Sequence, residues 1–251
     1  FKNNLSKIFF YDLETTYNGN ACLEVIDNKR KHLKTNKINS VAINMRNSFE
    51  WVTWYLAADA ECKKIFLIST DFTDPVVENI INKYEIEFLI QESEVKIIQN
   101  NDNNSNEERV DIIFTSGTTG MPKGVIIDEK SYIHVAEVLI NETTQDQDDL
   151  ELLSMPFDRS FGLARLRSCI LSGSSALIAQ GLKNFPEIYQ FSKKNPISGL
   201  SMVPAALQIL ILQLRKKAKL FTNNLKYLEL GSSSLIDGQF DWIKENMKNA
   251  I

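Results

Sequence analysis

A glycine- and hydroxyl-rich segment directly behind a short apolar run constrains the fold of this chain more than any other feature. The run V-D-I-I-F occupies residues 110–114, and T-S-G-T-T-G-M-P-K-G-V follows at residues 115–125. β-Branched and aromatic residues in such a run predict a buried strand. The backbone N–H groups and hydroxyls behind it can converge on an anion, and Lys123 adds a mobile cation. The pattern therefore predicts a phosphate-binding loop at the end of a buried strand.

Two other interpretations of this loop are available. The nucleotide P-loop, G-x-x-x-x-G-K-[ST], places glycine before the lysine and a hydroxyl after it. Here Pro122 precedes Lys123 and Gly124 follows it, so the P-loop template fails. An ordinary surface loop between strands is the simpler alternative. The string T-S-G-T-T-G-x-P-K-G-V instead resembles, at every fixed position, the signature loop of the adenylate-forming superfamily. That superfamily includes acyl-CoA synthetases, luciferases and the adenylation domains of peptide synthetases.

Strand-like and helix-like segments alternate along the chain, a pattern that predicts an α/β fold of helix-covered sheets. Strands are expected at residues 41–45, 65–68, 86–90, 95–98, 110–114, 124–127, 150–154, 176–179, 199–203 and 226–230. Helices are expected after Asn47 as N-cap, from Asp74, after Asp128 as N-cap, and at 161–171, 186–193, 204–217 and 236–247. Residues 99–109 contain no large apolar side chain and predict a polar linker between two subdomains, 1–98 and 110–251.

Composition narrows the class of protein. The 251 residues are 43% hydrophobic and 24% charged, which suits one large domain or two small ones. A formal charge of −4 does not favour a nucleic-acid partner. Cys22, Cys62 and Cys169 have no metal or redox spacing and predict a reducing, cytoplasmic location. No stretch predicts a membrane span or a signal peptide, and Phe1 in place of Met predicts that the native N-terminus lies upstream.

The resemblance to the adenylate-forming superfamily extends over nearly the whole chain. Residues 40–51 look like its early strand and helix, 155–163 like the segment that opens its acyl pocket, 199–207 like the strand and helix that line that pocket, and 230–235 like the turn beside the adenine. The resemblance implies cofactor-binding roles for Thr115, Ser116, Gly117, Thr118, Thr119, Gly120, Lys123, Gly124, Gly231, Ser232 and Ser233. It implies substrate-binding roles for Phe157, Asp158, Arg159, Phe161 and Gly162.

The same resemblance implies the chemistry and the fold. A carboxylic acid attacks the α-phosphorus of ATP, expels pyrophosphate and forms an acyl adenylate. The acyl group then passes to a phosphopantetheine thiol on CoA, or on an acyl or peptidyl carrier protein. Positioning and charge neutralisation by Mg²⁺, backbone donors and a lysine lower the barrier. Lys123 is accordingly the expected catalytic residue, no protein-held metal site is expected, and the chain should form part of the large N-terminal domain of such an enzyme.

Departures from the family pattern limit what carries over. Glu129 and Arg159 stand where acyl-CoA synthetases usually have histidines, so the roles of those histidines lapse. The chain also stops at Ile251, before the Y-G-x-T-E and T-G-D motifs and the lysine of a small C-terminal domain. We therefore expect that this stretch alone does not turn over.

The substrate remains open between two classes of carboxylic acid. F-D-R-S at residues 157–160 matches the F-D-x-S motif of amino-acid adenylation domains, in which the aspartate pairs the substrate ammonium group. Gly162, six residues after Pro156, fits the acyl-CoA synthetase spacing better and favours a fatty or aryl acid. A noncatalytic fragment that binds a nucleotide or a partner is the third possibility. His32 and His134 have no H-E-x-x-H spacing, which argues against a zinc hydrolase.

Overall fold

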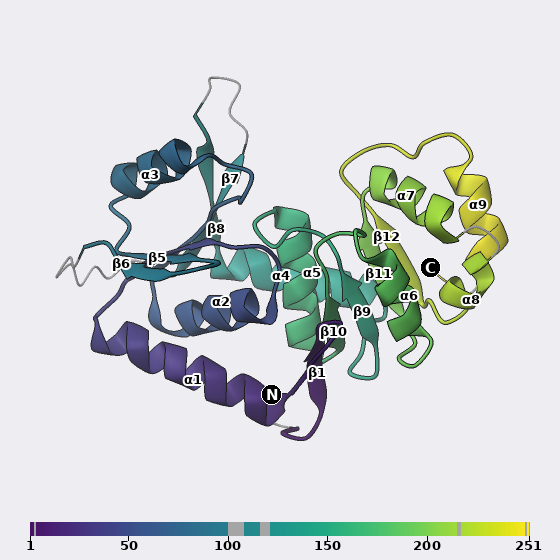
Figure 1. The fold of residues 1–251 in the computed structure, drawn as a ribbon, viewed down its shortest axis with the longest axis horizontal. Helices are drawn as coiled ribbons and strands as arrows, with labels where there is room; N and C mark the ends of the chain where they lie inside the picture. Colours follow the sequence, from purple (N-terminus) through teal and green to yellow (C-terminus); the bar gives the residue numbers. More distant parts are fainter. Residues whose placement is uncertain (3, 100–107, 116–120, 215–216, 249, 251) are drawn as a thin grey trace.

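The computed structural model describes residues 1–2, 4–99, 108–115, 121–214, 217–248 and 250. They form two six-stranded sheets with helices between and outside them (Figure 1). The predicted α/β class is confirmed. None of the helices in these ranges is long and apolar enough to cross a membrane.

The first sheet runs in the order β12-β11-β9-β10-β1-β2. Its strands are β1 (Ile8–Tyr11), β2 (Thr16–Asn18), β9 (Leu150–Leu153), β10 (Ser175–Ile178), β11 (Gly199–Met202) and β12 (Tyr227–Leu230). All neighbours are parallel except β1 and β2, which form an antiparallel pair. Parallel strands end at the same edge, so the loops after β9, β10, β11 and β12 gather there.

The second sheet runs in the order β6-β5-β3-β4-β7-β8. Its strands are β3 (Ser40–Asn44), β4 (Lys64–Leu67), β5 (Phe88–Gln91), β6 (Val95–Ile97), β7 (Val110–Thr115) and β8 (Lys123–Asp128). Strands β5, β3, β4 and β7 are parallel, and the antiparallel strands β6 and β8 close the two edges. The expected strands agree with these elements to within two residues at each end.

The helices form layers around the sheets. They are α1 (Gly19–Thr35), α2 (Phe49–Glu61), α3 (Asp74–Lys83), α4 (Glu129–Glu142), α5 (Ser160–Ser172), α6 (Phe185–Ser192), α7 (Pro204–Leu214), α8 (Ala218–Thr222) and α9 (Gln239–Asn246). Helices α2 and α5 lie between the sheets, and α3 covers the far face of the second sheet (Figure 1). Alternate residues of β3 serve the two sides: Val41 and Ile43 pack toward α2, and Ala42 packs toward α3.

Two local predictions need correction. Helix α2 begins after Ser48, whose hydroxyl accepts the Trp51 N–H at 3.0 Å; Asn47 is not the N-cap. The helix expected at 204–217 ends at Leu214 as α7, and Ala218 begins α8. Asp128 does cap α4, accepting the Ser131 N–H at 2.7 Å.

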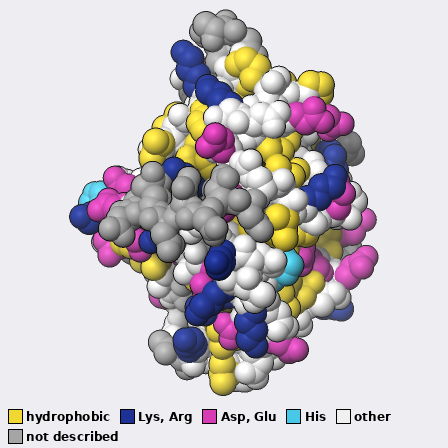
Figure 2. All heavy atoms as spheres, turned by 90° about the vertical axis from the view of Figure 1, so that its left-hand side faces the viewer, with side chains coloured by type: hydrophobic (Ala, Val, Ile, Leu, Met, Phe, Trp, Pro, Cys, Tyr) yellow, Lys and Arg dark blue, Asp and Glu magenta, His cyan; other side chains and the backbone are white. Residues whose placement is uncertain are grey.

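Each sheet contains strands from both sides of residues 99–109. Strands β1 and β2 join the first sheet with β9–β12, whereas β7 and β8 join the second. The segment between residues 99 and 109 therefore does not separate the two sheets, and residues 100–107 lie outside the described part of the chain. The boundary between subdomains 1–98 and 110–251 remains a prediction. Figure 2 shows the face formed by α1, α3 and β6, on which Lys and Arg side chains are interspersed with Asp and Glu.

Candidate functional site

The predicted phosphate loop joins two antiparallel strands. Thr115 ends β7, Lys123 begins β8, and the two residues are paired in register. The Thr115 hydroxyl donates to the Lys123 carbonyl oxygen at 3.4 Å, and the Lys123 side chain is exposed. A P-loop instead leads from a strand into a helix, so the hairpin agrees with the exclusion made from sequence. Ser116, Gly117, Thr118, Thr119 and Gly120 lie outside the described residues, and their roles remain predictions.

Gly124 has a packing reason to be glycine. A Cβ built there would stand 2.8 Å from Cγ2 of Ile112 and 3.1 Å from the Tyr84 hydroxyl. Any larger residue would push β8 away from the aromatic cluster beneath β7. This requirement is independent of the predicted contact with phosphate, which the structure does not test.

Arg159 connects the predicted acyl segment to the phosphate strand. Its guanidinium donates to the Phe114 carbonyl oxygen and to the Ser69 hydroxyl, each at 3.3 Å. Phe114 directly precedes Thr115, so this cation lies at the base of the phosphate loop. The side chain is thus directed toward the carboxyl ends of β4 and β7.

The acyl segment also meets the predicted adenine turn. A Cβ on Gly231 would stand 3.2 Å from Cε1 of Phe161, so the turn after β12 touches the start of α5. Ser232 and Ser233 in this turn are exposed, and Ser232 has a positive φ of 76°. Segments far apart in the sequence therefore meet near the carboxyl ends of both sheets.

Gly162 and Phe157 determine how the acyl segment packs against the rest of the protein. A Cβ on Gly162 would stand 2.1 Å from the Pro156 carbonyl oxygen, so only glycine allows α5 to begin against that backbone. Phe157 is only 1% exposed, and its ring lies 5.1 Å from that of Trp51 in the core. Asp158 is buried as well. The predicted substrate contacts of Phe157 and Asp158 stay predictions; the geometry shows a core packing role for Phe157.

Asn47 was missed as a member of the site. Its side-chain amide donates to the carbonyl oxygens of Met155 at 2.7 Å and Ala179 at 3.3 Å, and its oxygen accepts the Phe157 N–H at 2.9 Å. The resemblance of residues 40–51 to a family segment was the available signal, but the sequence pattern assigned this asparagine to helix capping.

A buried ionic cluster holds β7 against α5. The carboxylate of Asp111 in β7 pairs with Arg167 of α5 and, at 2.8 Å, with Arg109. The Tyr55 hydroxyl of α2 donates to Asp111 at 2.9 Å. Arg109 also pairs with Asp59 of α2 at 2.5 Å. Because Asp111 is fully buried, these contacts fix the strand that carries the phosphate loop.

A second buried cluster crosses the first sheet. The Arg165 guanidinium donates to both carboxylate oxygens of Glu151, at 2.8 and 2.6 Å, and to the Tyr227 hydroxyl at 2.7 Å. Ser201 donates to Glu151 at 3.0 Å. Glu229, at the end of β12, lies 3.5 Å from Arg165 at the rim of this cluster. Burial raises the pKa of the Glu229 carboxyl, the charge of Glu151 adds to the rise, and Arg165 opposes it.

The raised pKa of Glu229 predicts a pH-dependent stability. An acid with a raised folded-state pKa stabilises the fold below its ordinary value of 4.5, and this contribution is lost as the pH rises through the folded-state pKa. The side chain in Glu229→Gln stays neutral at every pH. The free energy of unfolding of this variant, relative to that of wild type, should therefore increase as the pH rises from acidic to neutral. Urea unfolding across that range, with Glu245→Gln on the exposed surface of α9 as control, measures the difference. A Glu229→Gln difference that does not change with pH would contradict this expectation.

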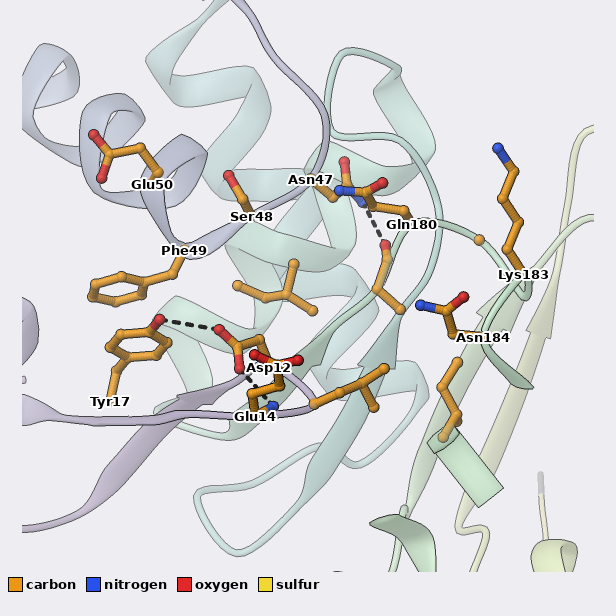
Figure 3. A pocket seen from close by; sticks show the side chains of 15 residues that line it. Asp12, Glu14, Tyr17, Asn47, Ser48, Phe49, Glu50, Gln180, Lys183 and Asn184 are labelled. Atoms are coloured by element: carbon orange, nitrogen blue, oxygen red, sulfur yellow. Dashed lines mark hydrogen bonds between the residues drawn. The ribbon is translucent and has the colours of Figure 1, made fainter. Parts of the chain in front are cut away.

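The cavity in Figure 3 lies next to Asn47, at the carboxyl ends of β1 and β10. Its volume is about 540 Å³. The stacked rings of Tyr17 and Phe49 form one wall, with centroids 3.6 Å apart, and Lys183 stands on the opposite side. Among the residues that the structure describes, the lining contains none of those predicted from sequence to bind ATP or the acyl group. Within the described ranges, no group of three or more His, Cys, Asp or Glu could hold a metal ion.

The arrangement of phosphate hairpin, acyl segment and small-residue turn can be compared with known proteins. The sequence profile of the AMP-binding enzyme family matches residues 30–250. The chain belongs to this family. The superfamily membership predicted from the phosphate loop is thereby confirmed.

Curated relatives of this AMP-binding chain include two kinds of enzyme. The fatty acid–[acyl-carrier-protein] ligase MmaC of Mycobacterium marinum is 29% identical over 137 residues, which cover 53% of this chain and 25% of the ligase. Tyrocidine synthase 3 of Brevibacillus parabrevis is 33% identical over 127 residues, 49% of this chain and 2% of the synthase. The matched region is therefore a quarter or less of each relative.

Solved structures show the fold of the AMP-binding chain. The N-terminal domain of FACL13 from Mycobacterium tuberculosis superimposes with a TM-score of 0.82 at 16% identity, covering 99% of this chain and 71% of that one. o-Succinylbenzoate CoA synthetase from Bacillus subtilis has a TM-score of 0.81 at 16% identity, covering 96% of this chain and 54% of the synthetase. The two sheets with their helices are thus the fold of the N-terminal domain of adenylate-forming enzymes.

Proposed function

We propose that this chain is part of an ATP-dependent ligase that converts a fatty or aryl carboxylic acid to its acyl adenylate and passes the acyl group to a phosphopantetheine thiol. The observation that carries the proposal is the convergence at the strand ends: Arg159 contacts Phe114 at the base of the phosphate hairpin, and the ring of Phe161 lies where a Cβ on Gly231 in the predicted adenine turn would meet it. Family membership supports an adenylate-forming ligase. Residues 1–251 alone are still predicted not to turn over.

The proposed reaction relies on positioning. The hairpin between Thr115 and Lys123 would bind the β and γ phosphates of ATP, and the Lys123 ammonium would neutralise the departing pyrophosphate. Arg159 would place a second cation at the base of the same hairpin. Mg²⁺ would accompany the ATP phosphates. The carboxylate would enter along the segment at residues 155–162, beside the start of α5, and attack the α-phosphorus in line.

The acceptor is proposed to be a carrier protein or CoA. The named activity of MmaC supports a carrier protein, and the named activity of the Bacillus subtilis synthetase supports CoA. Small-molecule carboxylic acids are the proposed substrates, and a cytoplasmic location remains a proposal. A noncatalytic nucleotide- or partner-binding role would require that the complete protein form no adenylate.

An amino acid is the alternative substrate, favoured by the F-D-x-S match. We expect the complete protein to release pyrophosphate with fatty or aryl acids, and Asp158→Ala to leave the order of preference among acids unchanged. If Asp158 instead receives an ammonium group, Asp158→Ala would abolish amino-acid activation, because an unpaired buried charge costs about 3–5 kcal/mol. Screening fatty, aromatic, dicarboxylic and amino acids with both proteins separates the two. Selective activation of amino acids, lost in Asp158→Ala, would overturn the fatty or aryl assignment.

A further inference from the structure

Asn47 links the two sheets at their carboxyl ends. It lies just after β3 of the second sheet, and all three of its side-chain hydrogen bonds go to loops of the first sheet. Both amide hydrogens are used, on the carbonyl oxygens of Met155 and Ala179, and the amide oxygen accepts the Phe157 N–H. Figure 3 shows the bond to Ala179 beside the cavity. Since Asn47 is only 9% exposed, water cannot easily replace these partners.

The backbone that Asn47 holds is the one on which α5 begins. Met155 and Phe157 are bonded on either side of Pro156. The Pro156 carbonyl oxygen accepts the Arg159 N–H at 3.3 Å and lies against Gly162 with no room for a Cβ. A displacement of this backbone would therefore move the whole start of α5.

The start of α5 in turn carries the two contacts that bring the site together. Arg159 reaches Phe114 at the phosphate hairpin, and Phe161 reaches Gly231. The three side-chain hydrogen bonds of Asn47 go to neither Phe114 nor Gly231, so its effect on them passes through the acyl segment. We propose that Asn47 is a positioning residue that sets the acyl segment, residues 155–163, relative to the end of β7 at Phe114. This assignment rests on the function proposed above.

Loss of Asn47 should affect the carboxylate more than ATP. Asn47→Ala leaves two carbonyls and one N–H without their partner, and the segment should shift to find others. A displacement of about 1 Å in a positioning element can cost about 100-fold in rate. ATP binding should change less than use of the carboxylate, because Asn47 forms no hydrogen bond to a described residue of the hairpin between β7 and β8 and reaches the ATP site only indirectly, through Arg159 and Phe161.

Ser40 provides a matched control at the opposite end of the same strand. Its hydroxyl accepts the Glu87 N–H at 3.0 Å, and the residue is buried. Ser40→Ala therefore also removes a buried bond between a side chain and a backbone N–H, but at the edge of the sheet away from the site. Both variants should lose thermal stability.

The test uses the complete protein and measures pyrophosphate release together with amide hydrogen exchange. Asn47→Ala should lower kcat/KM for the carboxylate by about 10- to 100-fold, change the KM for ATP by a clearly smaller factor, and accelerate exchange of the Phe157 amide. Ser40→Ala should keep both kinetic constants and accelerate exchange only at Glu87. Should Asn47→Ala fail to fold, Asn47→Asp tests the role of the amide donors, because an ionised carboxylate keeps the size of the side chain but has no N–H group to donate. Its activity relative to wild type should rise as the pH falls, because a protonated carboxyl regains one O–H donor.

The failures of the two proposals can be told apart. An active wild type whose Asn47→Ala variant keeps the wild-type kcat/KM for the carboxylate would overturn the positioning role and leave the proposed function standing. An equal loss in Ser40→Ala would also overturn it, since the effect would then follow from stability alone. If the wild-type protein releases no pyrophosphate with any of the carboxylic acids tested, the proposed function is overturned and, with it, this assignment.

Discussion

Lys123→Ala is expected to lower kcat/KM for ATP-dependent pyrophosphate release by about 10²–10³-fold in the complete protein. Lys123 begins β8 at the exit of the phosphate hairpin, and its side chain is exposed and forms no ion pair with the described residues. Its proposed partner is charge that develops on the departing pyrophosphate, so its loss should raise the barrier without disturbing the sheet. Steady-state kinetics with saturating carboxylate and varied ATP measure the effect.

Lys130→Ala is the matched control for this prediction. Lys130 is also an exposed lysine, placed in the first turn of α4 directly after β8. Its removal changes the net charge equally but should leave kcat/KM close to wild type. Equal rates for Lys123→Ala and wild type, or equal losses in both lysine variants, would mean that the hairpin lysine does not act on the phosphates.

The parts of the fold that the sequence predicts are those built from local signals. The apolar run at β7 and the loop behind it predicted both the strand and its connection, because a buried strand and a glycine-rich turn are encoded within a few residues. Asp128 predicted the start of α4 by the same local logic. No helix or strand was predicted within residues 1–39, although they contain β1, β2 and α1. Helix α1 buries only a narrow stripe, including Cys22, Ile26 and Leu33.

The parts that escaped prediction depend on contacts between distant residues. Strand β1 belongs to the first sheet because Phe10 pairs with Ala176, a match that no local pattern encodes. Asn47 and Ser48 are both acceptable N-caps, and only the positions of Met155 and Ala179 decide that Asn47 is used elsewhere. Similarly, Arg159 could be placed in the acyl segment, but its direction toward Phe114 follows from how the two sheets meet.

The largest stability effect is expected from Arg165→Ala. Arg165 is 1% and Glu151 0% exposed at the side chain, and the guanidinium forms two hydrogen bonds to that carboxylate. Burial acts to lower the pKa of Arg165, but the charge and hydrogen bonds of Glu151, together with Tyr227 and Cys169, more than offset it, and the net shift of the Arg165 pKa is upward. Removing the cation leaves a carboxylate buried in the first sheet. The free energy of unfolding should fall by about 3–5 kcal/mol, measured by urea denaturation.

Arg30→Ala is the control that shows whether the destabilisation by Arg165→Ala comes from burial of the ion pair or from ion pairing alone. Arg30 pairs with Glu61 at 2.8 Å, but its side chain is 40% exposed, so its loss should cost at most about 1 kcal/mol. A further variant tests the mechanism itself. In a Glu151→Gln background no buried charge is left behind, and Arg165→Ala should then cost clearly less than it does in wild type. If Arg165→Ala costs as little as Arg30→Ala, or costs the same in the Glu151→Gln background as in wild type, the uncompensated carboxylate is not what destabilises the sheet.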